Sequence, residues 1–171
     1  MRIILIRHGP AARRDAKRWP NDARRPLTAR GIERTELAMR GLKRLVEPTR
    51  ICTSPLVRSA ETAAIAHRVF AGSRAPETMA TLAPGCPYHR VVAHLAQFKP
   101  AETVVLIGHE PDLGKLAGVL IFGAPATTLP LKKAGACIID FVGKVESGKG
   151  LLRAFLPPRV IRTRTRAKVS S

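Results

Sequence analysis

The tripeptide Arg7-His8-Gly9 follows directly on the apolar run Ile3–Ile6 near the start of the chain. Four consecutive apolar residues, three of them β-branched, are typical of a short buried strand. An arginine presents a planar fork of donors that suits phosphate oxygens, and a histidine can act as a nucleophile or as an acid and base. Open α/β sheets bind ligands beyond the carboxyl ends of their strands, which is where the tripeptide would lie. The tripeptide is therefore a candidate phosphoryl-transfer site.

Three further residues with suitable chemistry follow or lie between other expected strands. Arg58 falls in the first turn of a helix expected after the strand 50–53, and His109 directly follows the buried strand 103–108. Arg25 begins the segment Arg-Pro-Leu-Thr between the first two strands. If the strands are parallel neighbours, both histidines and at least two arginines converge at one edge of the sheet. Helix N-termini at that edge would add backbone N–H donors.

A pocket of this composition suits a phosphoryl group. The arginines would bind its oxygens and stay protonated throughout, while one imidazole attacks phosphorus in line. The sequence shows no carboxylate cluster with metal-binding spacing. We therefore expect chemistry that needs no metal and no other cofactor.

These motifs resemble those of the histidine phosphatase superfamily, the group related to phosphoglycerate mutase. The short length and the lack of a large helical insertion look most like its small branch, the SixA-type phosphohistidine phosphatases. The resemblance covers residues 1–160, which we expect to form one histidine phosphatase domain. The matching residues are Arg7-His8-Gly9, Arg25-Pro-Leu-Thr28 with Gly31, Ser54-Pro-Leu with Arg58 and Glu61-Thr62, and Gly108-His109, in this order.

The resemblance implies a role for each candidate residue. His8 would be the nucleophile that becomes transiently phosphorylated. Arg7 and Arg58 would bind the phosphoryl group, and His109 would be the second histidine that contacts it. Arg25 matches a basic position near the pocket in the small branch and is carried over as a substrate-binding residue.

One departure from the family pattern concerns the leaving group. Larger members carry an acidic proton donor in the loop after the strand that we expect near 78–82, but the corresponding residues 83–89 include no carboxylate. The imidazole of a phosphohistidine leaves readily once it is protonated and needs little help from an acid. The sequence thus favours phosphohistidine over an alkyl phosphate and argues against mutase activity. His89, Tyr88 and Asp15 are the alternative acids.

The elements that would position the site alternate between strands and helices. This alternation predicts an α/β three-layer sandwich with a largely parallel central sheet flanked by helices, as in phosphoglycerate mutase. We expect strands at 2–6, 50–53, 77–82, 103–108, 136–142 and 151–156, with the last two as a hairpin or edge pair, and helices at 29–47, 55–70, 88–98 and 112–122.

Two helix starts carry sequence signals. Thr28 is a candidate N-cap before a helix whose apolar face would include Ile32. Ser54-Pro55 is a candidate N-cap with proline at the first helical position. For Glu61 and Thr62 we expect helix packing or capping rather than contact with substrate.

The formal net charge is +18, from 30 Lys and Arg against 12 Asp and Glu. Such an excess is typical of proteins that bind nucleic acid, an anionic membrane or an anionic substrate. Aromatic residues make up only 4% of the chain, and no stacking platform or known nucleic-acid motif is present. A solvated basic surface is therefore favoured over a nucleic-acid partner. The acid-free segment 161–171 is expected to be a mobile basic tail, which would steer the enzyme to an acidic protein if it has a role.

No apolar run is long enough to cross a bilayer, and the N-terminus lacks a secretory pattern, so we expect a cytoplasmic protein without a membrane partner. Cys52 and Cys137 lie in apolar runs and are expected to be buried, whereas Cys86 is expected in a loop.

The leading hypothesis is a phosphatase that acts on phosphohistidine in a protein through a phosphohistidine intermediate on His8. A small-molecule phosphomonoesterase of the same superfamily is the nearest alternative. A basic nucleic-acid-binding protein with a vestigial pocket is the alternative from another class. The sequence leaves the oligomeric state and the identity of the phosphorylated substrate open.

Overall fold

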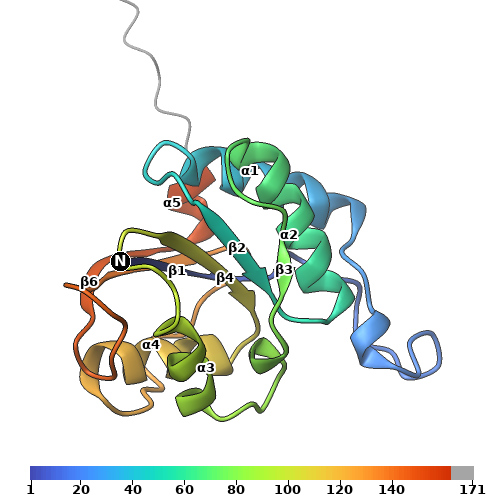
Figure 1. Ribbon diagram of the computed structural model, residues 1–171. Coiled ribbons are helices and arrows are strands. Elements are labelled where there is room, and N and C mark those ends of the chain that lie inside the picture. Colours follow the sequence, from blue (N-terminus) through green and yellow to red (C-terminus); the bar gives the residue numbers. More distant parts are fainter. Residues whose placement is uncertain (163–171) are drawn as a thin grey trace, which may run out of the picture.

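Six strands form one mixed sheet in the computed structural model, which describes residues 1–162 of the chain (Figure 1). Their order across the sheet is β3-β2-β4-β1-β5-β6. Neighbouring strands among β1 to β4 run parallel, β5 is antiparallel to β1, and β6 is antiparallel to β5. The largely parallel sheet expected from the sequence is confirmed. The strands are β1 (Arg2–Arg7), β2 (Arg50–Thr53), β3 (Glu77–Thr78), β4 (Thr103–Gly108), β5 (Ala136–Asp140) and β6 (Leu151–Leu156).

Helices cover both faces of the sheet, so the domain has the three layers that the sequence predicts. One face carries α1 (Ala29–Leu42), α2 (Val57–Phe70) and the short α5 (Pro158–Arg162), and the other carries α3 (Tyr88–Leu95) and α4 (Asp112–Phe122) (Figure 1). Two 3₁₀ turns, η1 (Asp22–Arg24) and η2 (Ala80–Leu82), lie in the connections. Within residues 1–162, no helix has the length and apolarity that crossing a membrane requires.

The central strand β1 is buried on both of its faces, which explains its unbroken apolar run. Successive side chains of a strand point to opposite faces of the sheet. Ile4 and Ile6 accordingly pack in the core beneath α1 and α2, while Ile3 and Leu5 pack in the core beneath α3 and α4. Cys52 and Cys137 are buried, as expected.

Several element boundaries differ from the sequence prediction. The N-cap of α2 is Leu56 and not Ser54; the Ser54 hydroxyl accepts from Leu56 N at 3.3 Å, which lies before the first helical residue, and also makes a long-range contact described below. Thr28 is confirmed as the N-cap of α1, since its hydroxyl accepts a hydrogen bond from Gly31 N. The prediction that Ile32 lies on the buried face of α1 is wrong, because this residue is 42% exposed.

Several expected elements are shorter than predicted, including β5, which ends at Asp140 and not at residue 142. α1 ends at Leu42 and α3 at Leu95, each followed by turns. β3 pairs with β2 through only two residues, because the chain turns into η2 directly after Met79. The predicted basic tail lies outside the described residues from residue 163 onward, whereas Ile161 is buried within α5.

Candidate active site

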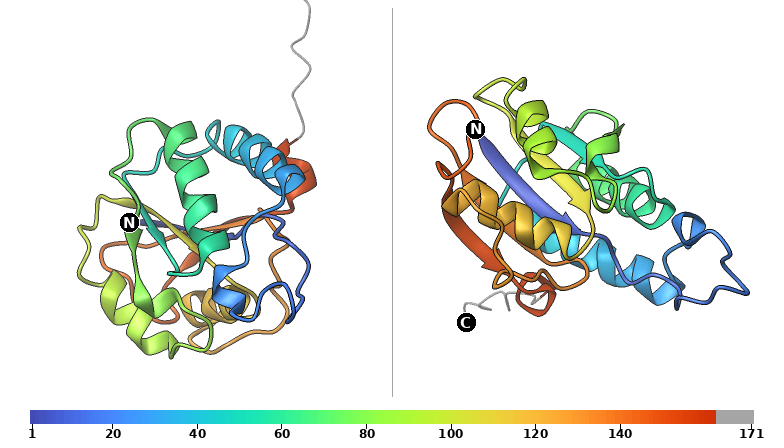
Figure 2. Two further views of the ribbon diagram at one scale, coloured as in Figure 1. Left: turned by 90° about the vertical axis from the view of Figure 1, so that its right-hand side faces the viewer. Right: turned by 90° about the horizontal axis from the view of Figure 1, so that it is seen from below.

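The strand register brings the two motif histidines together. β1 and β4 run side by side in the same direction (Figure 2), and Arg7 is the register partner of Gly108. His8 and His109 therefore leave adjacent strands at the same level of the sheet. Their side chains are 6% and 4% exposed, and their ring centroids lie 5.1 Å apart. The convergence predicted from the sequence is present.

The hydrogen bonds of His8 define which ring nitrogen is available for attack. Its Nδ1 lies 2.7 Å from the carbonyl oxygen of Gly9, which can only accept, so Nδ1 carries the proton and donates. Its Nε2 lies 3.3 Å from Nε of Arg58, which can only donate, so Nε2 is the acceptor. Both partners require the same neutral tautomer. The lone pair of Nε2 consequently faces the guanidinium of Arg58.

Arg58 is held in this position by Asp22 in the η1 turn. Arg58 is 4% exposed; its Nη1 donates to the carbonyl oxygen of Asp22 at 2.9 Å, and its Nη2 lies 3.1 Å from the Asp22 carboxylate. Arg25 also donates to this carboxylate at 2.9 Å and to the carbonyl oxygen of Ala12 at 2.7 Å. Hydrogen bonding from Arg25 lowers the pKa of Asp22 to about 2, so this carboxylate is ionised at neutral pH. Arg25 is thus linked to Arg58 indirectly, through the Asp22 carboxylate that both arginines contact.

The ring of His109 is oriented by two serine hydroxyls. Its Nε2 lies 2.8 Å from Oγ of Ser54 and 3.2 Å from Oγ of Ser59. Its Nδ1 is buried and has no hydrogen-bond partner among the described residues. That nitrogen is free to contact a substrate oxygen or a water molecule.

Arg7 is fixed at one end of its guanidinium only. Its Nη1 donates to the carbonyl oxygen of Leu131 at 3.0 Å, while its buried Nε has no partner among the described residues. The carboxylate of Glu110 accepts from Leu131 N and from Gly114 N, each at 3.1 Å, and so anchors the loop that holds Arg7. An orphaned buried donor on a cation is a feature that an anionic ligand would satisfy.

Burial keeps both imidazoles neutral. Burial lowers the pKa of His8 from 6.5 to about 3, and the neighbouring charges of Arg58 and Arg7 act in the same direction. Burial likewise lowers the pKa of His109 from 6.5 to about 4, again with Arg58 contributing. The site therefore combines cations that attract a phosphoryl group with an unprotonated nitrogen that can attack it.

The other polar residues of the motif support the backbone, as the sequence predicts. Thr62 accepts a hydrogen bond from Gly9 N at 3.0 Å and donates to the carbonyl oxygen of Arg58 at 2.7 Å. Glu61 accepts from Leu27 N at 2.6 Å. Thr62 in particular links the two motifs that carry the nucleophile candidate and its arginine.

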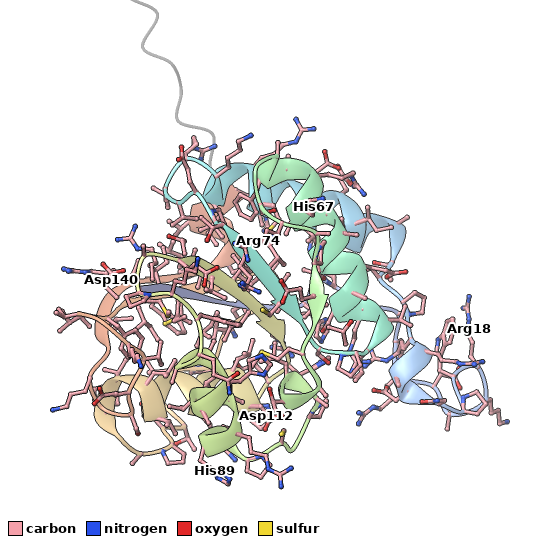
Figure 3. The ribbon with its side chains drawn as sticks, in the orientation of Figure 1. Arg18, His67, Arg74, His89, Asp112 and Asp140 are labelled. Atoms are coloured by element: carbon pink, nitrogen blue, oxygen red, sulfur yellow. The ribbon has the colours of Figure 1, made fainter. Side chains whose placement is uncertain are left out.

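The loop 83–89 is organised by a carboxylate outside it. Asp112, at the start of α4, accepts from Gly85 N at 3.1 Å, and the Tyr88 hydroxyl lies 3.5 Å from the same side chain. His89 is exposed on α3 and lies at the edge of the molecule (Figure 3). Asp15 accepts from the backbone of its own loop, at Lys17 N and Arg18 N. Within residues 1–162, Asp15 and His89 make no hydrogen bond to the histidine pair, whereas Tyr88 lines a small cavity together with His109 and Asp112.

Sequence reasoning missed Asp22, Ser59 and Glu110. A signal for Asp22 existed, because a buried arginine requires an anionic partner and only two acidic residues, Asp15 and Asp22, lie between His8 and Thr28. Ser59 and Glu110 follow motif residues directly but carry no spacing signal of their own. Within residues 1–162, no group of three or more His, Cys, Asp or Glu side chains is arranged to hold a metal ion.

Comparison with known proteins agrees with this geometry. An uncharacterised protein of Picosynechococcus sp. is 38% identical over 138 residues, which cover 79% of this chain and 82% of that protein. The solved structure of the protein histidine phosphatase SixA complexed with tungstate superposes with a TM-score of 0.79 at 26% identity, covering 93% of this chain and 98% of that one.

The alpha-ribazole phosphatase from Shigella flexneri has the same fold, with a TM-score of 0.71 at 19% identity, covering 92% of this chain and 97% of that one. A family model described as histidine phosphatase superfamily (branch 1) matches residues 3–83, which include β1, η1, α1, β2 and α2. With the motif residues assembled at one edge of the sheet, the chain belongs to the histidine phosphatase superfamily, branch 1.

Proposed function

We propose that this phosphatase hydrolyses phosphohistidine in a protein, through a phosphohistidine intermediate on Nε2 of His8. The contact between Arg58 and His8 supports the proposal most directly. The guanidinium that would bind a phosphoryl oxygen lies 3.3 Å from the nitrogen that would attack phosphorus. Cation and nucleophile are thus in the adjacent positions that an in-line phosphoryl transfer needs.

In the first step, Nε2 of His8 forms a bond to phosphorus while the bond from phosphorus to the substrate imidazole breaks; this ring, protonated on its other nitrogen in the bound substrate, leaves as a neutral imidazole. Arg58 and Arg7 bind the phosphoryl oxygens and offset the charge that builds on them. The His8 ring becomes cationic, and the Gly9 carbonyl oxygen that accepts from Nδ1 stabilises this charge. His109 contributes a hydrogen bond from its otherwise unpartnered Nδ1.

In the second step, a water molecule attacks phosphorus and the bond to His8 Nε2 breaks. The products are inorganic phosphate and the neutral His8 imidazole, and the proton released by the water passes to the phosphate or to solvent. Arginine side chains serve both steps because they stay protonated throughout. No step requires a group beyond the chain, the substrate and water.

The composition of the loop 83–89 supports phosphohistidine as the substrate. The Tyr88 hydroxyl in this loop lies 3.5 Å from the carboxylate of Asp112, and burial raises the pKa of its phenol. A phenol held in that state is a poor acid for an alkoxide leaving group at neutral pH. A protonated imidazole leaves without such help, so the site is better matched to a phosphoramidate bond than to an alkyl ester.

Trapping the phosphorylated enzyme tests the proposed nucleophile. Wild-type protein is mixed with radiolabelled phosphoramidate, quenched in alkali and separated from the reagent. We expect a label on the protein that is stable in alkali and lost in acid, because phosphohistidine has this stability pattern. The His8→Asn variant should carry no label, whereas His94→Asn, a change on α3 outside the site, should label like the wild type. Normal labelling of His8→Asn would refute the assignment.

Comparing substrates tests the proposed specificity. The same peptide is prepared with phosphohistidine and with phosphoserine, and kcat/KM is measured for both and for a set of small phosphate monoesters. The proposal predicts the highest kcat/KM for the phosphohistidine peptide. The second candidate function is a small-molecule phosphomonoesterase, which the fold shared with the alpha-ribazole phosphatase favours. A small monoester that is hydrolysed with a higher kcat/KM than the phosphohistidine peptide would support this candidate.

A further inference from the structure

A basic groove opens beside the candidate active site. It has a volume of about 750 Å³ and is bordered by β1, α1, the loop before β5, and α5. This volume lies within the range of roughly 300 to 1,000 Å³ that is usual for ligand pockets, and it exceeds what a single phosphoryl group would fill. The cations that line it are Arg7, Arg34, Lys132, Lys133, Arg159 and Arg162.

The remaining lining residues are three prolines, Pro10, Pro157 and Pro158, so no lining residue is acidic or aromatic. Like charges gathered along one groove repel one another unless an anion lies among them. Proline supplies rigid, weakly polar walls between the cations, because its ring fixes the backbone φ angle. The groove is therefore complementary to an extended chain with several negative charges.

The groove and the candidate active site share one residue, Arg7. The loop that carries Lys132 and Lys133 is tied to the end of β1 on either side of the two lysines. Before them, the carbonyl oxygen of Leu131 accepts from Arg7 Nη1 at 3.0 Å. After them, Ala134 N donates to the carbonyl oxygen of Arg7 at 3.0 Å. An anion bound by the lysines would thus lie next to the phosphoryl site.

The opposite wall of the groove is also fixed to the domain. Ile161 of α5 is buried in the core beneath α1. Its carbonyl oxygen lies so close to Gly41 of α1 that a side chain at this position would collide with it. The backbone of α5 is consequently held against the domain and need not be ordered when a ligand binds.

We propose that this groove binds acidic side chains that flank the phosphohistidine of the protein substrate, so that the enzyme prefers phosphohistidine in an acidic segment. This inference rests on the proposed function and adds the substrate's charge pattern to it. Charge complementarity to the lining cations, chiefly Arg34, Lys132 and Lys133, carries the assignment. Single-stranded nucleic acid usually requires aromatic side chains for base stacking, and the lining residues offer none.

Peptide binding tests the inference without any phosphoryl transfer. Two fluorescently labelled, unphosphorylated peptides of equal length are used, one with Glu and Asp around a central His and one with Gln and Asn instead. Their affinities for the full chain are measured by anisotropy at low and at high salt. The groove variant is Lys132→Gln/Lys133→Gln, which changes two exposed side chains.

The matched control variant is Lys144→Gln/Lys149→Gln, which removes the same charge from two exposed residues between β5 and β6. This loop follows Asp140, the register partner of Arg2, and so lies at the other end of β1 from the groove. Asp140 is labelled at the left-hand side of the molecule in Figure 3. Any effect of the overall charge of +18 should be equal in the two variants.

The acidic peptide should bind more tightly than the neutral one, and salt should reduce the difference. Loss of two surface ion pairs should weaken its binding to the groove variant by about two- to thirtyfold, while the control variant stays within about twofold of the wild type. Equal binding of the two peptides, or equal weakening in both variants, would overturn the inference. Tighter binding of a single-stranded oligonucleotide that also depends on Lys132 and Lys133 would reassign the groove to nucleic acid.

The outcomes remain distinguishable from those that test the proposed function. The probe peptides carry no phosphoryl group, so a failure to hydrolyse phosphohistidine would contradict the proposed function and leave the binding result valid. Conversely, a phosphatase that hydrolyses acidic and neutral phosphohistidine peptides with equal kcat/KM would lose the groove inference and keep the proposed function.

Discussion

The burial of two neutral imidazoles predicts that the protein loses stability as the pH falls. Both His8 and His109 have folded-state pKa values below their ordinary value of 6.5, at about 3 and about 4. In the unfolded chain each ring binds a proton near pH 6.5, whereas in the folded protein neither does so until the pH is far lower. The contribution of each ring to stability is therefore fully present above pH 6.5 and is lost as the pH falls toward the folded pKa.

The size of the effect at pH 5 depends little on the folded-state values, because at this pH both folded rings are still neutral. Each unit below 6.5 costs about 1.36 kcal/mol for each ring, so at pH 5 each ring lowers the free energy of unfolding by about 2 kcal/mol. The two rings together predict a loss of about 4 kcal/mol between pH 8 and pH 5, a large share of the ~5 to 15 kcal/mol typical of a folded domain.

Urea unfolding between pH 8 and pH 5 tests this prediction, in buffers free of phosphate because an anion in the pocket would itself stabilise the fold. His8→Asn and His109→Asn should each remove about half of the pH-dependent loss, whatever their effect at pH 8. The control His94→Asn should retain the full loss. The reasoning fails if the wild type and His8→Asn lose the same free energy over this range, since His8 would then titrate equally in both states.

Three further substitutions test other parts of the site and the groove. Arg58→Lys should lower kcat/KM by about 10²- to 10³-fold, because a lysine offers a point charge in place of the planar fork, and an unchanged kcat/KM would refute its proposed role. Thr62→Val leaves Gly9 N without its acceptor and should lower the free energy of urea unfolding by about 1 to 3 kcal/mol; no loss would mean that this hydrogen bond is replaced. Gly41→Ala forces a methyl group against the Ile161 carbonyl oxygen and should cost about 1 to 3 kcal/mol as well as weaken binding of the acidic peptide. Unaltered peptide binding in that variant would show that α5 is not part of the groove.

The fold and the central residues of the site could be predicted because they follow from local patterns and one topological rule. Continuous apolar runs identify β1 and β4, and parallel pairing then aligns the residues that follow them. Once Arg7 pairs with Gly108, the proximity of His8 and His109 requires no further information. The placement of Arg58 follows in the same way from β2, which pairs with β4.

The residues that sequence reasoning missed depend on contacts between distant segments. Ser54 before a proline is a typical helix start, and its hydroxyl does accept from Leu56 N, but no local pattern indicates that it also contacts His109. Asp22 reaches Arg58 from a long loop whose path is set by tertiary contacts. The helix α5 has only five residues, too few to show a period, and its position depends on Ile161 packing under α1.

The arrangement of the site reconciles two opposing requirements on charge. A phosphoryl group needs cations, while an attacking imidazole must be neutral, and cations placed beside a histidine satisfy both because they disfavour its protonated form. The hydrogen bonds of His8 strengthen this effect. Since Nδ1 already donates to Gly9, an added proton would reside on Nε2 and point at the N–H of Arg58. Two donors cannot share a hydrogen bond, so the arginine that we propose as a phosphoryl ligand also keeps the proposed attacking nitrogen unprotonated.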